Sequence, residues 1–593
     1  MGKYIKKLVS ILIVITTILA SSITYSRLVQ AEESDTQEST DVIVYVFKGD
    51  EVHEIKDNVI SWLNHYGNEV GGYTFVLNQD LEISAPLYVN KTWTIKMNGH
   101  KIYRTLSYAV DNGEIFNIEA YTTLNLYGTG DSRVPGSSDS VQNTEFTYWG
   151  YRKDDSTSAF AKEELTVTAG GLLTGGYTTN NGGAIYLRHD STLNLYNVAI
   201  NGNTNLNGEN GGGAIYTEGS NCTINMDNSH IDHNYSAHHG GGIYISRNSS
   251  ATINMKDSTV DYNIAKYFGG GIEAEGKIII NGDISNYHSS VSHNYSNSCG
   301  GGIYLSGYCD NSEIRKININ NNYANSPCGG IYINCENTRL ADVTINDNTA
   351  KGFAGGVYVD DDGTVFIDCK ITGNKTLKGE DGKDCYAGGM YVFTRYDITM
   401  NGKCVVENNY NSEGKADNVY LNDAWIFGQA YIKGKLTDGA RVGLNCDSTR
   451  SQKIGINIED YIDGRYFLDR PENLHLYYKK NDKELYQESG ESRKYTLTVN
   501  GVDIGDYYQG KTVTISDNNE DSEKIFLNWD TTHAKGLDYI DIPKEEQVFT
   551  ITMPGNDVSI DANYLDRLTS LNLTIIEDSP TAGSYLPESV KYT

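Results

Sequence analysis

Hydrophobic and polar residues alternate in short segments through the middle of the chain. In Ile243-Tyr244-Ile245 the two isoleucines share one face and the tyrosine takes the other, as the two-residue period of a β-strand requires. A second such segment, Thr252-Ile253-Asn254-Met255, and a third, Thr259-Val260-Asp261, follow closely. No stretch of ten residues in this region shows the period of an amphipathic helix. The pattern predicts three short strands per unit.

This unit recurs nine times between Gly182 and Tyr420, eight times with two or three glycines, an apolar residue and usually a tyrosine, and last in the degenerate form Asp417-Asn418-Val419-Tyr420. The position after the apolar residue is occupied in turn by Tyr186, Tyr216, Tyr244, Glu273, Tyr304, Tyr332, Tyr358, Tyr391 and Tyr420. Successive positions lie 26 to 33 residues apart, a period typical of a solenoid or a propeller. A propeller blade needs four strands and roughly 40 residues. We therefore predict an all-β protein: a right-handed parallel β-helix followed by a small C-terminal β-rich domain.

An asparagine also recurs after the third strand of each unit. It occupies positions Asn203, Asn234, Asn263, Asn294, Asn322, Asn348, Asn374 and Asn409. Asparagine tolerates the left-handed backbone of a sharp corner, and stacked asparagines can pass hydrogen bonds from coil to coil. The glycines suit the opposite corner. Because no helix follows the glycines, they are not phosphate-binding loops, and we expect structural roles for both sets.

Composition shifts along the chain predict its organisation. Three lysines, an apolar run and a small-residue site ending at Ala31 indicate a secretory signal peptide. A serine-rich and aspartate-rich stretch over 131–163 suggests an insertion loop. The predicted segments are the signal peptide 1–31, a leader and N-terminal cap with a short helix at 32–72, the β-helix 73–434, closing strands at 435–490, a small β-domain at 495–564, and the start of a further β-domain or a tail at 565–593.

Charge limits the classes of partner, and the spacing of the cysteines bears on metal binding. Loss of residues 1–31 leaves 44 basic and 77 acidic residues, a net charge of −33 that repels nucleic acid and anionic membrane surfaces. We expect a mature chain that is exported, with no membrane insertion and no nucleic-acid partner. Nine cysteines, seven of them between Cys299 and Cys404, show no C-x-x-C spacing, which favours disulfides or free thiols over a metal site. No cofactor is predicted, and Ca²⁺ has no support in the sequence.

Two segments carry resemblances. The run "TLTVNG…YYQGKTVTI…FLNWD…FTITMPGNDVSIDANY" within 495–564 resembles a bacterial repeat domain related to the internalin B-repeats of Gram-positive surface proteins. The repeated units, with "VLNQDLEISAPLYVNKTWTIKMNGHKI" ahead of them, are similar to right-handed β-helix surface proteins that share an architecture with pectate lyases and many adhesins. The resemblances imply secretion and association with the cell surface, and say less about chemistry.

Candidate chemistry lies on the outer face of the units. Glu273 replaces tyrosine, and Glu275 lies on the same face, which makes them the best carboxylate pair in the array. A polysaccharide lyase would also need a Ca²⁺-binding carboxylate cluster and a cationic side chain, and no Arg or Lys recurs at the matching positions. His230, His233, His238 and His239 crowd one unit, where packing or a solvated turn is the ordinary explanation.

The stronger lead is the set of eight tyrosines, which we interpret as candidate ligand-binding residues: Tyr186, Tyr216, Tyr244, Tyr304, Tyr332, Tyr358, Tyr391 and Tyr420. An aromatic stripe with hydroxyls can stack on sugar rings or recognise a protein. The alternative is that tyrosine fits a half-exposed strand and stacks on its neighbours. The hypothesis is a non-enzymatic, adhesin-like protein that binds an extracellular glycan or a host or cell-surface protein. The other candidates are a polysaccharide lyase or glycoside hydrolase on the same scaffold, and a purely structural stalk.

Overall fold

The computed structural model describes most of the chain between residues 42 and 566. The gaps within that range are 68, 70–71, 154–159, 284–287, 380, 394–395, 425–427, 447–450, 462–463, 470–473, 490–493, 509–510, 518–520, 522, 536, 538–541, 544 and 554–556. The predicted signal peptide, most of the leader and nearly all of 565–593 lie outside the described residues. The chain divides into two compact units between Ser492 and Arg493, and each is described by itself.

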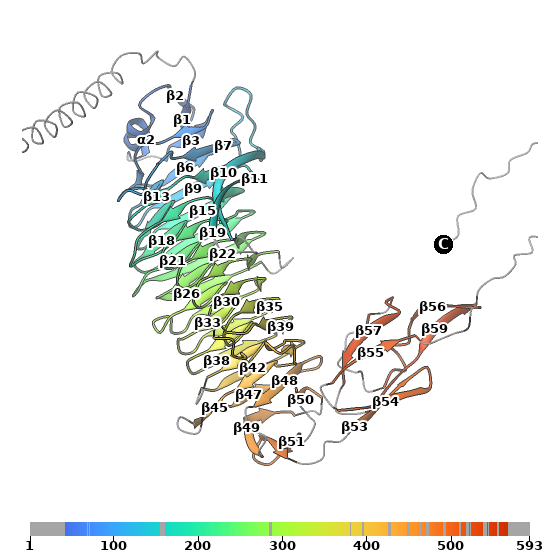
Figure 1. Cartoon of the computed structure of the whole chain (residues 1–593). Coiled ribbons are helices and arrows are strands. Elements are labelled where there is room, and N and C mark those ends of the chain that lie inside the picture. Colours follow the sequence, from blue (N-terminus) through green and yellow to red (C-terminus); the bar gives the residue numbers. More distant parts are fainter. Residues whose placement is uncertain are drawn as a thin grey trace, which may run out of the picture. The chain divides into compact units, whose positions relative to one another are not determined.

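The first unit is a parallel β-helix, in which each strand pairs with its counterpart in the next coil (Figure 1). The first ladder begins with β5 (Leu87–Val89) and β8 (Phe116–Ile118) and continues with one strand of each repeated unit: β14 (Ile185–Arg188), β18 (Ile215–Glu218), β21 (Ile243–Ile245), β25 (Ile272–Ala274), β29 (Ile303–Leu305), β33 (Ile331–Ile333), β37 (Val357–Val359), β41 (Met390–Val392) and β44 (Val419–Leu421). The register places Ile243 between Ile215 and Ile272, and Tyr244 between Tyr216 and Glu273. Equivalent residues therefore stack along the whole ladder.

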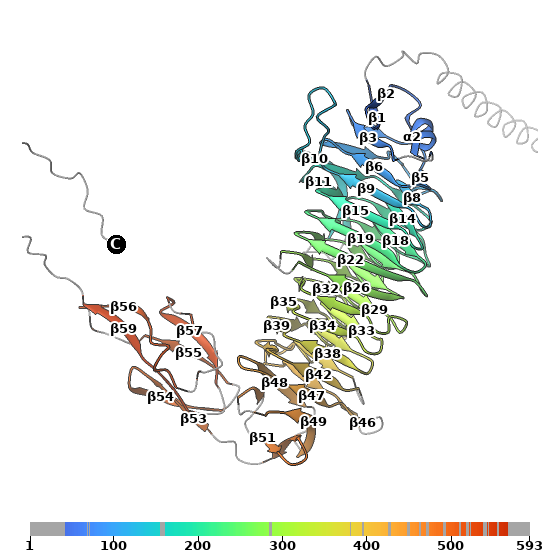
Figure 2. The ribbon, with the colours of Figure 1, turned by 180° about the vertical axis from the view of Figure 1, so that it is seen from behind.

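Two further ladders form other sides of the coils, as Figure 2 shows from behind. The second is β3 (Thr74–Leu77), β6 (Trp93–Lys96), β9 (Thr123–Tyr127), β15 (Thr192–Tyr196), β19 (Cys222–Asp227), β22 (Ser250–Lys256), β26 (Lys277–Asn281), β30 (Glu313–Arg315), β34 (Arg339–Ala341), β38 (Thr364–Ile367), β42 (Ile398–Asn401), β47 (Ile432–Lys435) and β49 (Gln452–Glu459). The third is β4 (Leu81–Glu82), β7 (His100–Tyr103), β12 (Gly171–Thr174), β16 (Val198–Ile200), β23 (Thr259–Asp261), β27 (Ser290–Ser292), β31 (Asn318–Asn320), β35 (Thr344–Asn346), β39 (Lys370–Thr372) and β43 (Val405–Glu407). His230 bridges β16 and β23 by single pairings to Ala199 and Thr259. The first and third ladders both pair with β48 (Arg441–Cys446), which is followed by β50 (Tyr466–Leu468).

The prediction of three strands per coil is incomplete, because a fourth ladder of two-residue strands follows the recurrent asparagine. Its members are β13 (Tyr177–Thr178), β17 (Thr204–Asn205), β20 (Tyr235–Ser236), β24 (Ile264–Ala265), β28 (Tyr295–Ser296), β32 (Tyr323–Ala324), β36 (Thr349–Ala350) and β40 (Lys375–Thr376). Two residues are too few for a two-residue period to be visible in the sequence.

The apolar interior is one continuous stack. The predicted inward residues are all fully buried in a single apolar cluster: Ile185, Ile215, Ile243, Ile303, Ile331 and Val357. The tyrosines that follow them lie outside this cluster. The inward and outward assignment of the first ladder is confirmed, and the burial of a thin but continuous core is what stabilises a coil that cannot fold alone.

The recurrent asparagines form a second, polar stack in the interior. Asn263 donates from its side chain to Ile231 O at 2.7 Å, and its Oδ1 accepts from both the backbone and the side chain of Asn234 at 3.0 Å. The predicted left-handed conformation does not belong to these asparagines. It belongs to the residue before each of them, as at His233, Tyr262 and His293. The asparagine turns inward because its amide satisfies backbone groups that the corner would otherwise leave unpaired.

The N-terminal end of the β-helix is covered by a cap. The short helix predicted within 32–72 is α2 (Val59–Gly67), and Glu51–Ile55 ahead of it forms strand β2. Strand β2 pairs antiparallel with β1 (Val44–Lys48) around Gly49, whose positive φ suits a two-residue hairpin turn. Val59 and Leu63 of α2 join the apolar core, so the helix covers the open end of the stack.

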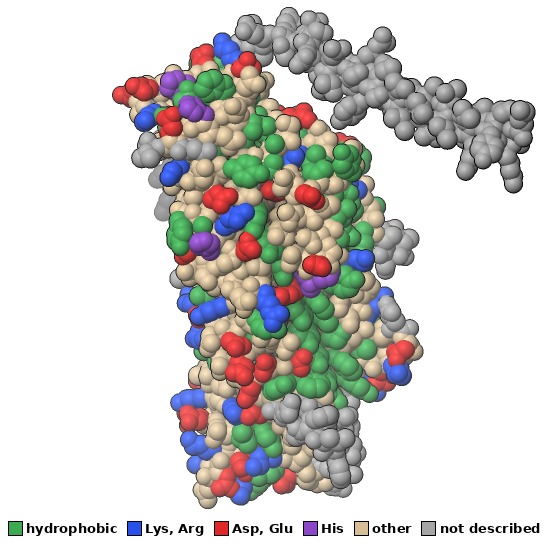
Figure 3. Space-filling model, turned by 90° about the vertical axis from the view of Figure 1, so that its left-hand side faces the viewer, with side chains coloured by type: hydrophobic (Ala, Val, Ile, Leu, Met, Phe, Trp, Pro, Cys, Tyr) green, Lys and Arg blue, Asp and Glu red, His purple; other side chains and the backbone are tan. Residues whose placement is uncertain are grey.

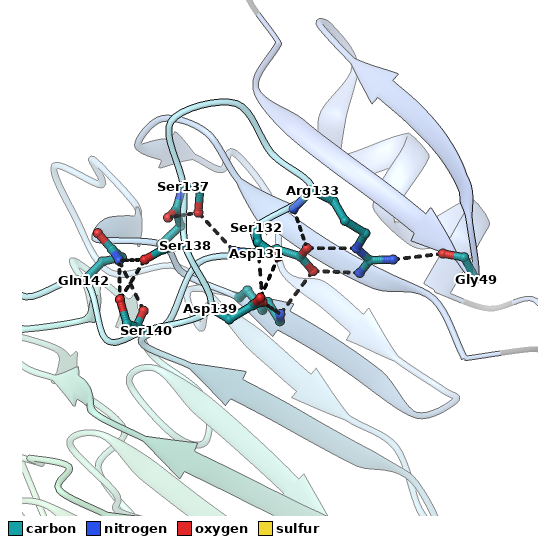
Figure 4. A network of polar contacts seen from close by, with 11 residues as sticks. Gly49, Asp131, Ser132, Arg133, Ser137, Ser138, Asp139, Ser140 and Gln142 are labelled. Carbon is teal, nitrogen blue, oxygen red and sulfur yellow. Dashed lines mark hydrogen bonds and ion pairs between the residues drawn. The ribbon is translucent and has the colours of Figure 1, made fainter.

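A loop after β9 ties the cap to the coils (Figure 4). Asp131, which is almost fully buried, accepts two hydrogen bonds from the Arg133 guanidinium at 2.8 and 2.6 Å and one from Lys96 at 3.1 Å. Arg133 also donates to Gly49 O at 2.8 Å. These charged partners hold the pKa of Asp131 well below its usual range. The carboxylate therefore stays ionised and joins the hairpin of the cap to the first coils.

The predicted insertion loop is largely a hairpin. Strands β10 (Thr144–Lys153) and β11 (Phe160–Ala169) pair antiparallel over their whole length. The Tyr148 hydroxyl lies 3.0 Å from His233 Nδ1, and Tyr151 stacks on Tyr235 with ring centroids 4.6 Å apart. The hairpin thus covers the corner of the asparagine ladder.

Antiparallel strands follow the last coils. Strand β49 pairs with β52 (Glu484–Ser489), which pairs with β51 (Leu474–Lys479). The second unit is also all-β. Its strands are β53 (Lys494–Val499), β54 (Val502–Tyr508), β55 (Thr512–Ser516), β56 (Lys524–Trp529), β57 (Val548–Thr552), β58 (Val558–Ile560) and β59 (Ala562–Asp566). Leu497, Ile515, Trp529 and Met553 belong to a core of its own.

Candidate binding row and carboxylate cluster

The eight predicted tyrosines form one row along the first ladder, which we call the tyrosine row. Neighbouring rings in its C-terminal half are nearly parallel: the centroids of Tyr304 and Tyr332 lie 5.0 Å apart, and the later pairs follow at 4.7, 4.9 and 5.4 Å, the last between Tyr391 and Tyr420. Figure 3 shows a band of hydrophobic side chains on this face of the β-helix. The structure therefore brings the predicted residues together.

The expected exposure of the row is wrong. Tyr216, Tyr244, Tyr358, Tyr391 and Tyr420 are buried, and only Tyr186, Tyr304 and Tyr332 are partly exposed. From Tyr304 to Tyr420 each ring stacks on the ring of the next coil, because coils repeat at the spacing of neighbouring strands, about 4.8 Å. Tyr186 and Tyr216 instead meet edge-on. Side chains from the loops before the glycines add to this cover, as Phe353 does against Tyr391 at 5.1 Å. In the C-terminal half of the row, ring faces are thus occupied by other rings and do not offer a stacking surface for sugars.

Hydroxyl groups of the row contact a second line of residues. Two positions after Glu273 and after each tyrosine except Tyr391, on the same face, lie the members of what we call the polar row: Arg188, Glu218, Ser246, Glu275, Ser306, Asn334, Asp360 and Asn422. After Tyr391 the apolar Phe393 takes this position and interrupts the row. The Tyr332 hydroxyl donates to Asp360 Oδ2 at 2.6 Å, the Tyr186 hydroxyl donates to Glu218, and Asn422 donates to the Tyr391 hydroxyl. Asp360 lies two residues after Tyr358, and this spacing is a signal in the sequence that places it in the polar row.

Glu273 interrupts the tyrosine row, and two aromatic side chains from the loops carry the ring stack past it. His239 stacks on Tyr244 with centroids 5.6 Å apart and on Phe268 at 5.5 Å, and Phe268 stacks on Tyr304 at 4.7 Å. Glu273 is only 1% exposed beneath these rings. A carboxyl group therefore occupies a ring's place in an otherwise aromatic layer.

Glu273, Glu275 and His239 form a compact cluster at this interruption. His239 Nδ1 lies 2.8 Å from Glu273 Oε2, and one ligand atom from each of the three residues lies within 4.8 Å of the others. Among the described residues this is the single group of three or more His, Cys, Asp and Glu side chains close enough to share an ion. The sequence singled out both glutamates. It did not link them to His239, which approaches from the preceding coil.

Burial sets the protonation of the cluster. Burial raises the pKa of Glu273 well above its ordinary value, and the Glu275 carboxylate raises it further. Burial also lowers the pKa of His239 to about 4, although Glu275 opposes that shift. Burial thus favours the uncharged form of both Glu273 and His239, next to the Glu275 carboxyl group.

A second carboxylate pair lies on the third ladder and was missed by the sequence interpretation. Asp232 Oδ1 accepts from Asp261 N at 3.0 Å and from Thr259 Oγ1 at 3.1 Å. Asp261 in turn accepts from Ser292 N at 2.7 Å. Burial raises the pKa of Asp261 to about 6, and burial together with Asp261 raises the pKa of Asp232. The signal was available in the sequence, because Asp232 follows Ile231 as Asp261 follows Val260, so alternation places both aspartates on the outer face.

We expect Asp261→Asn to stabilise the β-helix above pH 6. A carboxyl group whose pKa is raised on folding binds protons more tightly in the native state, so its contribution to stability falls as pH rises from about 4 to about 6. The amide keeps an oxygen for Ser292 N and removes the repulsion with Asp232, a gain of about 1 kcal/mol or more. Urea unfolding at pH 4, 6 and 8 would measure it.

The control for this variant is Asp227→Asn. Asp227 pairs with Lys256 at 3.0 Å on the outer face of the second ladder, so its loss should lower stability slightly. If Asp261→Asn is as stable as the native chain at pH 4 but less stable at pH 8, the assignment of the raised pKa is wrong.

The corner histidines and the cysteines have structural roles. His233, Tyr262 and His293 stack on one another at 4.8 and 4.6 Å, in agreement with packing at a corner. The eight cysteines whose side chains are described are free thiols, and most are buried. Among the described residues, no helix combines the length and apolar character needed to cross a membrane.

No family model, no curated protein and no solved structure matches this chain. The parallel β-helix rests on its strand pairing alone. The resemblance of 495–564 to internalin B-repeats stays a prediction from the sequence.

Proposed function

We propose that the chain is a secreted or cell-surface bacterial protein, adhesin-like and non-enzymatic, that binds an extended extracellular glycan lengthwise along the polar row. The observation that carries this is that tyrosine hydroxyls lie beside carboxylates and amides in several coils, as in Tyr332–Asp360 and Tyr391–Asn422. Neighbouring coils lie about 4.8 Å apart. An extended polymer along the row can thus meet polar groups in several coils.

Charge favours a neutral or amino-sugar glycan over a polyuronate. The polar row carries Glu218, Glu275 and Asp360 against the single cation Arg188, and the whole chain has a net charge of −29. Like charges would repel an acidic polysaccharide, whereas they attract a cationic one. A polyuronate lyase is for the same reason a poorer fit. A host or cell-surface protein is an alternative ligand for the same row.

The predicted signal peptide and the internalin-like segment support surface display in a Gram-positive bacterium. Net negative charge supports the expectation that neither nucleic acid nor membrane is a partner. Both parts of the proposal come from sequence, and the binding row comes from the arrangement of side chains.

Glycoside hydrolysis is the second candidate, and the Glu273–Glu275 pair is what favours it. Hydrolysis of a glycosidic bond uses one carboxylic acid that donates a proton and one carboxylate that acts as base or nucleophile. The raised pKa of Glu273 favours its protonated form beside Glu275, which is the direction that this division of roles requires. The near-complete burial of Glu273 counts against it, since a catalytic acid has to reach the glycosidic oxygen.

The test is binding of residues 32–593 to a panel of neutral, amino-sugar and acidic polysaccharides, followed by titration calorimetry with the best binder. We expect Tyr332→Phe combined with Asp360→Asn to weaken binding by about 1–3 kcal/mol, because hydrogen bonds to the glycan are lost. Phenylalanine keeps the ring, so the stack of rings stays intact. The matched control is Tyr196→Phe, whose ring stacks on Tyr127 at 4.5 Å on the second ladder.

Binding that is unchanged in the double variant, or equally weakened in Tyr196→Phe, would contradict the proposed row. A purely structural stalk would bind none of the polysaccharides in the panel. If the native chain released new reducing ends and Glu275→Gln did not, the protein would be a glycoside hydrolase.

A further inference from the structure

We propose that His239, Glu273 and Glu275 bind one divalent transition-metal ion, for which Zn²⁺ is the best match, at the interruption of the tyrosine row. The proposal concerns the cluster alone and does not depend on glycan binding. It rests on the spacing of the ligand atoms, on their chemistry and on the way the rings around them hold them in place.

The spacing suits a small ion. Zinc bonds to imidazole nitrogen and carboxylate oxygen are about 2.0–2.2 Å long, which places ligand atoms of a tetrahedral site about 3.4 Å apart. The Nδ1 atom of His239 and Oε2 of Glu273 are 2.8 Å apart, and all three ligand atoms lie within 4.8 Å. Shifts of less than about 1 Å, within reach of side-chain rotation, would bring them onto a common centre.

The donor set discriminates among metals. One imidazole nitrogen with two carboxylate oxygens suits zinc and its neighbours in the first transition row. Ca²⁺ takes six to eight oxygen ligands, more than this cluster supplies. Three protein ligands leave one position of a tetrahedral zinc ion for water or for a group of a bound ligand.

The surrounding side chains orient the ligands before any ion arrives. The His239 ring lies between those of Tyr244 and Phe268, nearly parallel to both. This packing on both faces limits the rotation of the imidazole and keeps it beside Glu273.

Local backbone geometry depends on one glycine. Gly240 has φ 52°, and a Cβ there would lie 2.5 Å from Ile243 O and 2.8 Å from Tyr244 Cβ. Glycine therefore lets the His239 loop lie directly on β21, so that the imidazole reaches Glu273 of the following coil.

Charge gives the cluster a reason to take a cation. Two carboxyl groups lie side by side, and Glu273 and His239 are at least nine-tenths buried. A buried carboxylate is costly unless it is paired or coordinates a metal. A proton shared by Glu273 and His239 is the alternative to a bound metal ion, and an experiment can distinguish the proton from the metal.

The test uses residues 32–593 after treatment with a chelator and its removal. We expect titration calorimetry to show one saturable Zn²⁺ per chain with a Kd in the micromolar range or tighter, and Zn²⁺ to raise the melting temperature while Ca²⁺ does not. Glu275→Gln and His239→Gln should each weaken Zn²⁺ binding at least tenfold. Glutamine preserves the approximate size of both side chains.

Two controls keep the result specific. Glu218→Gln removes a carboxylate of the polar row outside the cluster, and His293→Gln removes a histidine from the corner stack. Both should bind Zn²⁺ as the native chain does. Circular dichroism must show that Glu275→Gln and His239→Gln retain the β-helix. If His239→Gln does not fold, Glu275→Gln decides the question alone.

The proposal is overturned if the native chain shows no saturable binding of one Zn²⁺. It is equally overturned if Glu275→Gln binds Zn²⁺ as tightly as the native chain, which would leave the shared proton as the explanation of the cluster. Zinc binding without glycan binding would support this site while contradicting the proposed function, so the two fail separately.

Discussion

Replacing Ile243 by aspartate should unfold the β-helix or lower its free energy of unfolding by more than about 4 kcal/mol. Ile243 is fully buried and lies in register between Ile215 and Ile272. An aspartate there would place an unpaired charge in a continuous apolar stack, and neither neighbouring coil offers a partner in that stack. Denaturant unfolding monitored by circular dichroism, with the midpoint of the first unit's transition as the readout, would measure the loss.

Tyr244→Phe is the matched control for this variant. It changes the next residue of the same strand, keeps the ring and removes only the hydroxyl, so we expect a loss of about 1 kcal/mol. Tyr244→Ala is a different matter. Alternation alone predicts a mild effect for an outward residue, but Tyr244 is 2% exposed and packs on Tyr216 and His239, so a loss of about 2–4 kcal/mol is now expected. A native-like midpoint for Ile243→Asp would refute the inward assignment.

Asn263→Ala should have the second largest effect, about 3–5 kcal/mol. The Asn263 side chain is fully buried and bonds to Ile231 O, to Asn294 Oδ1 and to two donors of Asn234. Alanine would leave the Ile231 carbonyl and two Asn234 donors without these partners, and each buried unsatisfied group costs about 1–3 kcal/mol. Thermal and urea unfolding should both report the loss.

Asn254→Ala tests whether burial, and not the amide ladder as such, causes that effect. Asn254 also belongs to a ladder, since it donates to Asn225 and accepts from Asn281 at 2.7 Å, but it lies half-buried on the outer face of β22. Water can replace its partners, so a loss below about 1 kcal/mol is expected. Equal losses in the two variants would contradict the explanation.

The architecture could be predicted from sequence because it depends on local alternation repeated many times. The period of two around Ile243-Tyr244-Ile245 assigns faces, and the recurrence every 26 to 33 residues assigns stacking. Features of one or two residues escaped this reasoning. Strands such as Tyr235–Ser236 are too short to show a period. The left-handed backbone at the corner is that of His233, although the next residue, Asn234, is of the type that tolerates this conformation best.

The candidate site could be predicted only in part, for a different reason. Glu273 stands out because it breaks a repeated pattern, and alternation places Glu275 on the same face. The contact between His239 and Glu273 depends on how a loop lies against the next coil, and no period in the sequence records that. The burial of the tyrosine row likewise arises from ring-on-ring packing between coils, whereas alternation separates only core from outside.

The in-register stacking of equivalent residues has a consequence for how such a chain can change over generations. Each coil offers its successor the same pattern of isoleucine, tyrosine and asparagine that it received from its predecessor. Duplication or loss of one whole coil would therefore leave every remaining interface matched and alter the length by about 4.8 Å. Insertion or deletion of a single residue within a strand would instead exchange its inner and outer faces. Growth by complete coils, with smaller insertions confined to loops such as the β10–β11 hairpin, is the course that this geometry tolerates.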